Sequence, residues 1–192
     1  MLNLISIFNM DLVSIITPAH NSEKYLKDCI VSVLNQTFKY WEMLIVDDAS
    51  SDNSRTVIES YLNRDKRIKA FFLEKNIGPA MARNYAINKA SGRYIAFLDS
   101  DDIWLPHKLK VQLDFMKLNN YSFVFSSYQV ISEDNNTIIN SIQVPKKINY
   151  NQYLKNTIIG CLTVVIDRKK HQRIKMPNLR SSQDMATWLN LL

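Results

Sequence analysis

The sequence predicts an α/β fold: a doubly wound, mostly parallel sheet with helices on both faces and a more antiparallel C-terminal half. Up to about residue 120, short apolar runs rich in β-branched residues alternate with segments whose apolar residues recur at helical spacing. This alternation is typical of strand–helix–strand units, which build parallel sheets. After residue 120, two strand-like segments flank a turn-forming sequence, and this pattern favours antiparallel pairing.

The composition is that of a folded globular chain. Of its 192 residues, 46% are hydrophobic and 22% are charged, which is enough apolar content for one core and argues against disorder. We expect a single domain over 1–192. The formal net charge of +6 favours an anionic partner. Because the basic residues are scattered along the chain, we do not expect that partner to be nucleic acid.

The cysteines and the N-terminal segment indicate a cytoplasmic protein. Cys29 and Cys161 lack the spacing of a zinc site and lie in apolar segments, so we expect both to be buried and inert. The apolar segment 1–10 is too short to span a bilayer and lacks the basic start of a secretion signal. We therefore predict a cytoplasmic location.

Four strands of the parallel sheet are expected, each an apolar run closed by proline or by polar residues. They lie at 12–17, 41–46, 68–73 and 93–98. Continuous apolar runs of this length suit strands that are buried on both faces. Pro18 closes the first strand, and the sequence 47–52, rich in Asp and Ser, breaks the second.

Four helices connect and follow these strands. Apolar residues at helical spacing mark them at 25–34, 57–62, 82–89 and 109–116. Either Asn21 or Ser22 is expected to cap the first helix, and Pro79 begins the third. Gly92 is expected to cap the end of the third helix, and Pro106 begins the fourth.

The second half of the chain is expected to carry antiparallel strands. Segments 122–131 and 137–144 flank the turn-forming residues 133–136 and predict a hairpin. A further strand is expected at 162–166, where apolar and β-branched residues cluster again.

Polar residues follow three of the four parallel strands. They are Pro18, His20 and Asn21 after the first strand, Asp47 and Asp48 after the second, and Asp99, Ser100, Asp101 and Asp102 after the fourth. In open α/β sheets, ligands bind outside the carboxyl ends of the strands. Three loops are therefore expected to converge on one rim of the sheet, and this rim is the candidate site.

Asp99 and Asp101 are the candidate metal ligands. They stand two residues apart, so a continued strand would project both side chains to the same side. Neighbouring carboxylates repel each other unless a hard divalent cation such as Mg²⁺ or Mn²⁺ binds them. In the alternative, these aspartates cap the helix that begins at Pro106. Their position after a buried strand favours the metal.

Asp48 has two interpretations of the same kind. The sequence that follows it, rich in Ser, Asp and Asn, is typical of a helix N-terminus, where an aspartate caps the first turn. At the rim of a sheet, a carboxylate can equally accept hydrogen bonds from the N–H of a base or from ribose hydroxyls. The sequence leaves both interpretations open.

Four segments together resemble the family 2 glycosyltransferases of the GT-A fold, which transfer sugars from nucleotide diphosphates with inversion at the anomeric carbon. They are VSIITPAHN at 13–21, IVDDASSDNS at 45–54, KNIGPAMARNYAI at 75–87 and FLDSDDIWLP at 97–106. The resemblance implies a Rossmann-like nucleotide-binding half at 12–120 and an acceptor-side half at 121–192. A nucleotidyltransferase is less favoured, because the N-terminal region has no Gly-rich phosphate loop.

The resemblance assigns the base of the donor to the loops after the first two strands. It implies that Asp48 accepts from a uracil-type base and that His20, in one loop with Pro18 and Asn21, packs against that base. His20 departs from the family pattern, which commonly has tyrosine or phenylalanine there. Alanine likewise replaces the usual glycine at position 49. Neither change removes a required group.

The resemblance assigns the sugar-phosphate part of the donor to the aspartate loop. It implies that Asp99 lies on the ribose side with Ser100 beside it, and that Asp101 binds a divalent metal, Mn²⁺ or Mg²⁺. It also places Arg83 near the nucleotide or near this loop.

The family's acidic residue at the start of a helix near the acceptor corresponds to Asp184 in SSQDMATWLNLL. The resemblance implies that Asp184 is the general base, which removes the proton from the acceptor hydroxyl as that oxygen attacks the anomeric carbon. In the alternative, Gln183 and Asp184 only cap this helix. Trp104 and Trp188 are either sugar-stacking residues or core anchors.

The predicted function is transfer of a hexose from a nucleotide-diphosphate sugar, in first place a UDP-sugar, to a glycan or lipid-linked acceptor in cell-surface polysaccharide biosynthesis. The expected partners are this donor, this acceptor and, peripherally, the inner face of the cell membrane. The alternative is a C-terminally truncated domain that binds the donor without turnover, because the chain stops eight residues past Asp184.

Overall fold

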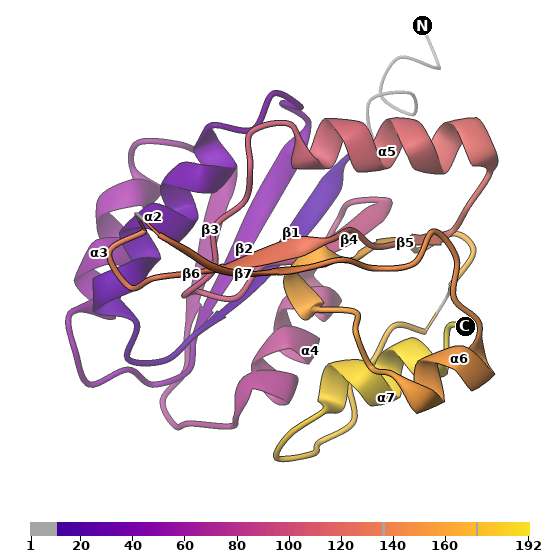
Figure 1. Cartoon of the computed structure of the whole chain (residues 1–192). Coiled ribbons are helices and arrows are strands. Elements are labelled where there is room, and N and C mark those ends of the chain that lie inside the picture. The colour runs from indigo at the N-terminus through magenta and orange to yellow at the C-terminus, as the bar shows by residue number, and fades with distance from the viewer. Residues whose placement is uncertain (1–10, 136, 172) are drawn as a thin grey trace, which may run out of the picture.

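The computed structural model describes residues 11–135, 137–171 and 173–192, with helices on both faces of a central sheet (Figure 1). The sheet has six strands in the order β3-β2-β1-β4-β8-β5. These strands are β1 (Val13–Ala19), β2 (Trp41–Asp47), β3 (Ile68–Phe72), β4 (Tyr94–Phe97), β5 (Phe123–Val124) and β8 (Val165–Asp167). A separate sheet pairs β6 (Tyr128–Ile131) with β7 (Ile138–Ile142).

The strand directions confirm the predicted fold class. β1 pairs in parallel with both β2 and β4, and β2 pairs in parallel with β3. β8 is antiparallel to β4 and to β5, and β6 is antiparallel to β7. Every antiparallel pair thus involves the second half of the chain, as the change of pattern after residue 120 predicts.

Two sets of helices cover the two faces of the sheet. The helices are α2 (Glu23–Leu34), α3 (Ser54–Leu62), α4 (Pro79–Lys89), α5 (Lys108–Asn119), α6 (Tyr150–Lys155) and α7 (Gln183–Leu189), with a 3₁₀ turn at Cys161–Thr163. The buried sides of α2, α3 and α5 share one core, and those of α4, α6 and α7 share the other. Figure 1 shows α5 and α4 on opposite sides of the sheet. Burial on both faces explains why the parallel strands are continuous apolar runs.

β1 runs past its predicted end, through Pro18 to Ala19. The Ile16 carbonyl accepts from the Leu98 N–H (3.0 Å) and the Ala19 carbonyl accepts from the Asp48 N–H (2.8 Å), so alternate residues of β1 bond toward β4 and β2. Pro18 is two residues after Ile16, so its backbone nitrogen points toward β4, which has already ended at Phe97. The N–H that proline lacks is therefore not needed there.

The prediction that Gly92 caps α4 is wrong. The C-cap residue of α4 is Ala90, in extended conformation. A Cβ on Gly92 would lie 2.6 Å from the carbonyl oxygen of Leu12 and 2.7 Å from the backbone nitrogen of Ser14. Glycine is required here because the chain entering β4 passes directly against the start of β1.

The predicted strand 122–131 is in fact two strands. Its first part is β5 in the main sheet, and its second part is β6, which pairs with β7 to form the predicted hairpin. Residue 136 of the predicted turn lies outside the described residues. At the hairpin tip Glu133 binds Lys24 and accepts from the Tyr25 hydroxyl (2.8 Å), and Asn135 Nδ2 donates to Asp28 (3.0 Å). These contacts hold the hairpin against α2.

Two local features of the second half differ from the prediction. The expected strand at 162–166 starts within the 3₁₀ turn and becomes β8 only at Val165. α6 is not among the predicted helices, although a capping box marks its start. Gln152 N donates to Asn149 Oδ1 (3.0 Å) and Asn149 N donates to Gln152 Oε1 (2.9 Å).

None of the helices within 11–135, 137–171 and 173–192 has the length and apolar character that crossing a bilayer requires. The prediction for segment 1–10 concerns residues outside this described part of the chain.

A buried carboxylate in β2 joins three segments of the fold. Glu42 accepts hydrogen bonds from Ser14 Oγ (2.6 Å), Lys69 Nζ (2.7 Å) and both the backbone nitrogen and the hydroxyl of Ser91 (2.7 Å each). Burial opposes ionisation of Glu42, but these donors outweigh it and lower the pKa of the carboxyl from 4.5 to about 2.

Replacing Glu42 by glutamine is expected to lower the free energy of unfolding by on the order of 2–3 kcal/mol near neutral pH. Because the folded-state pKa is lowered, this stabilisation is complete above about pH 4.5 and is lost as the pH falls through about 2. Urea unfolding near pH 7 and near pH 3 should therefore show the gap between the two proteins narrowing in acid. Glu59→Gln, in an exposed pair with Arg55, is the control, and equal stability of both variants near pH 7 contradicts the prediction.

Candidate functional site

A cavity of about 250 Å³ opens at the carboxyl ends of the parallel strands. Residues from the end of β1, from the loops after β1, β2, β3 and β4 and from the first half of α4 line it. They are Pro18, Ala19, His20, Asp48, Asn76, Pro79, Arg83, Asp99, Ser100 and Asp101. Of the residues predicted to bind donor or metal, only Asn21 is not in this lining. The structure therefore brings the three predicted loops together at one rim.

Ala19, Asn76 and Pro79 line the cavity but are not among the predicted site residues. Asn76 Nδ2 donates to the Asp48 carbonyl (3.3 Å), and its Oδ1 accepts from the Gly78 N–H (3.1 Å). Asn76 lies in the loop after β3, four residues past the end of that strand, so it belongs to the same rim of the sheet. Asn76 could have been predicted from the sequence if the residues that follow the third strand had also been considered, because ligands bind outside the carboxyl ends of all the parallel strands.

The loop after β1 is hydrogen-bonded to the loop after β2. His20 Nδ1 lies 2.8 Å from the carbonyl oxygen of Asp48, so this ring nitrogen is assigned the proton and donates. Asn21, in the left-handed region with φ 49°, donates its backbone N–H to Ser50 Oγ (3.0 Å) and accepts at Oδ1 from the Ser51 N–H (2.8 Å). Asn21 thus shapes this loop, and its role as a substrate ligand stays a prediction.

The helix that follows this loop begins after Ser22, as predicted, but the Ser22 side chain does not cap it. The Ser22 hydroxyl instead lies 2.7 Å from Ser100 Oγ and so connects the first loop to the aspartate loop. The second loop satisfies the N–H groups at the start of α2: Ser22 N donates to Ser54 Oγ (2.7 Å) and Glu23 N donates to Asp52 Oδ2 (3.0 Å). The polar loops therefore fix one another's positions.

Asp48 is buried, and each of its carboxylate oxygens accepts a backbone N–H. Oδ1 accepts from Ile77 (2.7 Å) and Oδ2 from Gly78 (2.8 Å), whose φ of 83° is a conformation that suits glycine. Asp48 does not cap α3, because Asp52 Oδ1 accepts the Ser54 N–H (2.9 Å) there. Since each carboxylate oxygen has two lone pairs, Asp48 can still accept from a ligand in the cavity.

Arg83 and Asp99 form an ion pair in the cavity, with 2.6 Å between Arg83 Nη2 and Asp99 Oδ1. The Arg83 side chain is 7% exposed and that of Asp99 is 28% exposed. Burial opposes the charge on Arg83, but neighbouring groups outweigh it and raise the pKa of the guanidinium: Asp99 contributes most, followed by Cys161 and, least, by Asp184. Arg83 therefore stays cationic next to the aspartate loop, where the resemblance places it.

The aspartates after β4 do not continue the strand, which corrects the predicted geometry. β4 ends at Phe97, and a turn follows in which the Asp102 N–H donates to the Asp99 carbonyl (3.1 Å). Short polar side chains favour such turns over extended backbone. Burial, followed by the charges of Asp99 and Asp101, raises the pKa of Asp102 to about 7. The turn therefore brings the negative charges of the aspartates together, but strand geometry does not place Asp99 and Asp101 on the same side.

The donor set of this turn fits a divalent cation such as Mg²⁺ or Mn²⁺. Asp101 is exposed and makes no hydrogen bond within the described part of the chain, and Arg83 engages only one oxygen of Asp99. No group of three or more potential ligands occurs among the described residues. Mg²⁺ usually takes one or two carboxylates and completes its coordination with phosphate oxygens and water. The aspartates do not cap α5, whose N-cap residue is His107.

Asp184 is the second residue of α7 and is half-buried. It does not line the 250 Å³ cavity and makes no hydrogen bond to the described residues. Its charge still reaches the site, since it adds to Asp99 in raising the pKa of Arg83 and adds to burial in raising the pKa of Tyr153. The N-cap residue of α7 is Ser182, so the capping alternative for Asp184 is not observed.

The tryptophans and cysteines near the site belong to the core. Trp188 is fully buried, and Trp104 is 6% exposed with its indole N–H donating to a backbone carbonyl at 2.9 Å. Both observations support the core-anchor interpretation. Cys29 and Cys161 are buried free thiols, as predicted, and burial raises the pKa of each.

Known proteins are similar to this chain in sequence. Residues 14–174 match the family described as Glycosyl transferase family 2. Over 181 residues the chain is 49% identical to TuaG of Bacillus subtilis (strain 168), a glycosyltransferase assigned to teichuronic acid biosynthesis, covering 94% of this chain and 72% of TuaG. It is 46% identical over 181 residues to WfgD of Escherichia coli, named a UDP-Glc:alpha-D-GlcNAc-diphosphoundecaprenol beta-1,3-glucosyltransferase, covering 94% of this chain and 70% of WfgD.

Solved structures share the fold. The structure of S. aureus TarS 1-349 in complex with UDP superposes with a TM-score of 0.74 and 27% identity, covering 93% of this chain and 54% of that chain. The chain thus spans about half of that TarS chain. The mannosyltransferase PcManGT from Pyrobaculum calidifontis, in complex with GDP-Man and Mn²⁺, has the same fold, with a TM-score of 0.69 and 15% identity over 91% of this chain and 50% of that one. With a family match over most of its length and a relative that is nearly half identical, this chain belongs to the family 2 glycosyltransferases and has their GT-A fold.

Proposed function

We propose that this chain transfers a hexose from a UDP-sugar to a hydroxyl of a glycan or lipid-linked acceptor, with inversion, during assembly of a cell-surface polysaccharide. The observation that carries the proposal is the 250 Å³ cavity, in which Asp48, Arg83, Asp99 and Asp101 meet from separate segments. The relatives TuaG and WfgD support the polysaccharide context, and TarS, which was solved with UDP, supports the choice of nucleotide.

The loops after β1 and β2 bind the base in this proposal. Two backbone N–H groups hold the Asp48 carboxylate, so it is preorganised to accept from the N–H of a uracil. The bond from His20 Nδ1 to the Asp48 carbonyl fixes the imidazole beside it, where the ring can pack on the base. Asn21 shapes the same loop, and Pro18, near the end of β1, lines the cavity.

The aspartate loop binds the ribose and the diphosphate. Asp99 accepts from a ribose hydroxyl at the oxygen that Arg83 leaves open, with Ser100 beside it. Asp101 and Asp99 would hold a divalent cation, Mn²⁺ or Mg²⁺, which when bound neutralises charge on the departing diphosphate. Arg83 keeps Asp99 oriented through their ion pair.

Asp184 acts on the acceptor. The acceptor oxygen forms a bond to the anomeric carbon while the bond from that carbon to the diphosphate breaks, and UDP leaves with the electron pair. The proton of the acceptor hydroxyl passes to Asp184. Asp184 suits this role because its carboxylate is unengaged among the described residues and because it adds, less than Asp99 does, to the raised pKa of Arg83 in the donor cavity.

The acceptor side is assigned to residues 121–192 and the donor side to 12–120, within one domain over 1–192. β5 and β8 of the second half extend the sheet of the first half, which supports this division within one unit. The name of WfgD specifies a lipid-linked acceptor, so we place the reaction at the cytoplasmic face of a membrane. The free thiols of Cys29 and Cys161 suit a reducing compartment.

The direct test is to incubate the protein with a panel of nucleotide sugars, with and without Mn²⁺, and to measure donor binding, then donor hydrolysis and transfer. Metal-dependent binding of UDP-sugars with turnover is expected. Binding without turnover would favour a domain that only binds the donor. The relatives do not favour this alternative, because TuaG and WfgD are named as glycosyltransferases and align with 94% of this chain. The absence of any UDP binding would refute both.

A further inference from the structure

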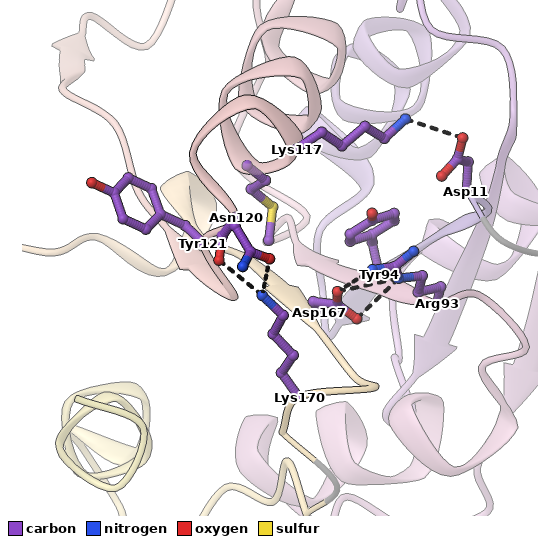
Figure 2. A pocket seen from close by; sticks show the side chains of 9 residues that line it. Asp11, Arg93, Tyr94, Lys117, Asn120, Tyr121, Asp167 and Lys170 are labelled. Carbon is purple, nitrogen blue, oxygen red and sulfur yellow. Dashed lines mark hydrogen bonds and ion pairs between the residues drawn. The ribbon is translucent and has the colours of Figure 1, made fainter.

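A second cavity, of about 350 Å³, lies at the opposite end of the sheet from the donor site, between the end of α5, the start of β4 and the end of β8 (Figure 2). Ionisable and polar side chains dominate its lining. The lining residues are Asp11, Arg93, Tyr94, Met116, Lys117, Asn120, Tyr121, Asp167 and Lys170. Nothing in the proposed transfer reaction uses this cleft.

The charges in the cleft do not cancel. Figure 2 shows Arg93 paired with Asp167 (2.6 Å) and Lys117 paired with Asp11 (3.0 Å). Among the described residues, the Lys170 ammonium donates only to the carbonyl and side-chain oxygens of Asn120, at 2.8 and 2.6 Å. Its charge helps to lower the pKa of Asp167, but that carboxylate is already paired with Arg93, so one positive charge is left over in the cleft.

Further cations surround the cleft. Lys147 lies 5.9 Å from the ring of Tyr121, and exposed Lys169 adjoins Lys170. Arg168 does not belong to this surface, because its guanidinium donates to the carbonyl of Ala90 (2.8 Å) at the end of α4, on the other side of the sheet. We call Lys147, Lys169 and Lys170 the basic cluster. None of them has an ion-pair partner in the part of the chain that the structure describes, so the surface carries excess positive charge.

An apolar stripe runs along α5 beside the basic cluster. Val111, Phe115 and Leu118 are 61%, 48% and 86% exposed. They stand four and three residues apart, so they share one side of the helix, opposite the side that packs into the core.

We propose that the apolar stripe of α5 and the basic cluster together dock on the surface of an anionic phospholipid bilayer. An apolar helix face beside several uncompensated cations is the combination that binds such interfaces, the apolar side chains entering the acyl boundary and the cations meeting the lipid phosphates. Docking through α5 would hold the chain at the surface in which a lipid-linked acceptor is anchored. That consequence rests on the proposed transfer to a lipid-linked acceptor, whereas the docking itself does not.

The test is co-sedimentation of the protein with vesicles of phosphatidylcholine alone and of phosphatidylcholine mixed with phosphatidylglycerol. Binding only to the mixed vesicles, weakened by salt, is expected. Because each basic residue near the surface contributes roughly fivefold in affinity, Lys147→Gln with Lys170→Gln should weaken binding about 25-fold. Leu118→Ser should also weaken it, with little effect on folding because this side chain is exposed.

The matched control is Lys155→Gln with Lys175→Gln, which removes the same charge from exposed positions on the side of α4, α6 and α7. Equal weakening by both double variants, or equal binding to both kinds of vesicle, overturns the proposal. So does a dimer in sedimentation velocity that Leu118→Ser dissociates, because a second copy would then cover the stripe. UDP binding, measured on the same samples without vesicles, reports separately on the proposed function.

Discussion

Asp101→Ala is expected to reduce metal-dependent binding of the UDP-sugar donor by at least about 100-fold, because it removes a carboxylate that links the cation to the protein. Asp101 lines the donor cavity and is exposed, and its carboxylate makes no hydrogen bond to the described residues. Its removal should therefore leave folding unchanged. Calorimetric titration of UDP with and without Mn²⁺ measures the effect, which should appear only when the metal is present.

Asp114→Ala is the matched control for Asp101→Ala. Asp114 is an exposed carboxylate on α5 that pairs with Lys110, and it does not line the donor cavity. The Asp114→Ala variant should bind UDP with the same affinity and the same metal dependence as the wild type. If Asp101→Ala keeps the full metal dependence of donor binding, the assignment of Asp101 to the metal is wrong.

Asp184→Asn is expected to lower the rate of sugar transfer by roughly 10²–10⁴-fold while leaving donor affinity unchanged, because it removes a general base and nothing from the donor cavity. Asparagine has almost the same shape as aspartate, and Asp184 makes no hydrogen bond to the described residues, so the packing of α7 should be kept. Transfer kinetics with a saturating UDP-sugar, together with UDP titrations, separate the two quantities.

The comparison between the two variants tests the division of the site. Asp101→Ala should lose donor binding, whereas Asp184→Asn should bind the donor and fail to transfer. Equal loss of donor binding in both would show that Asp184 belongs to the donor side. Unchanged transfer by Asp184→Asn would show that another residue removes the proton.

The sequence alone determines the alternation of strands and helices in the first 120 residues. The apolar runs and the helical spacings can each be recognised within a short stretch of sequence. A strand that is buried on both faces must be apolar along its whole length, so its pattern is distinctive. The position of the site follows from the same pattern, because residues just past parallel strands must meet at one edge. Asp48 and the aspartate turn are therefore found together, and Asn76 is found when the rule includes β3.

Tertiary contacts decide what each of these side chains does. The ion pair of Arg83 with Asp99 joins residues of α4 and the aspartate loop, and the Asp48 carboxylate is held by N–H groups from a loop 29 and 30 residues away. Propensity cannot indicate such partners, because they depend on how the elements pack.

The same reason explains where the sequence prediction failed. The chain needs glycine at 92 because of the carbonyl of Leu12 in a distant segment, and no local signal reports that contact. The segment 122–131 divides because its first residues pair with β8, while its last residues pair with β7 and approach α2 through the hairpin tip. Local patterns thus determined the elements and the rim, and long-range packing decided the partners, charges and strand pairings within them.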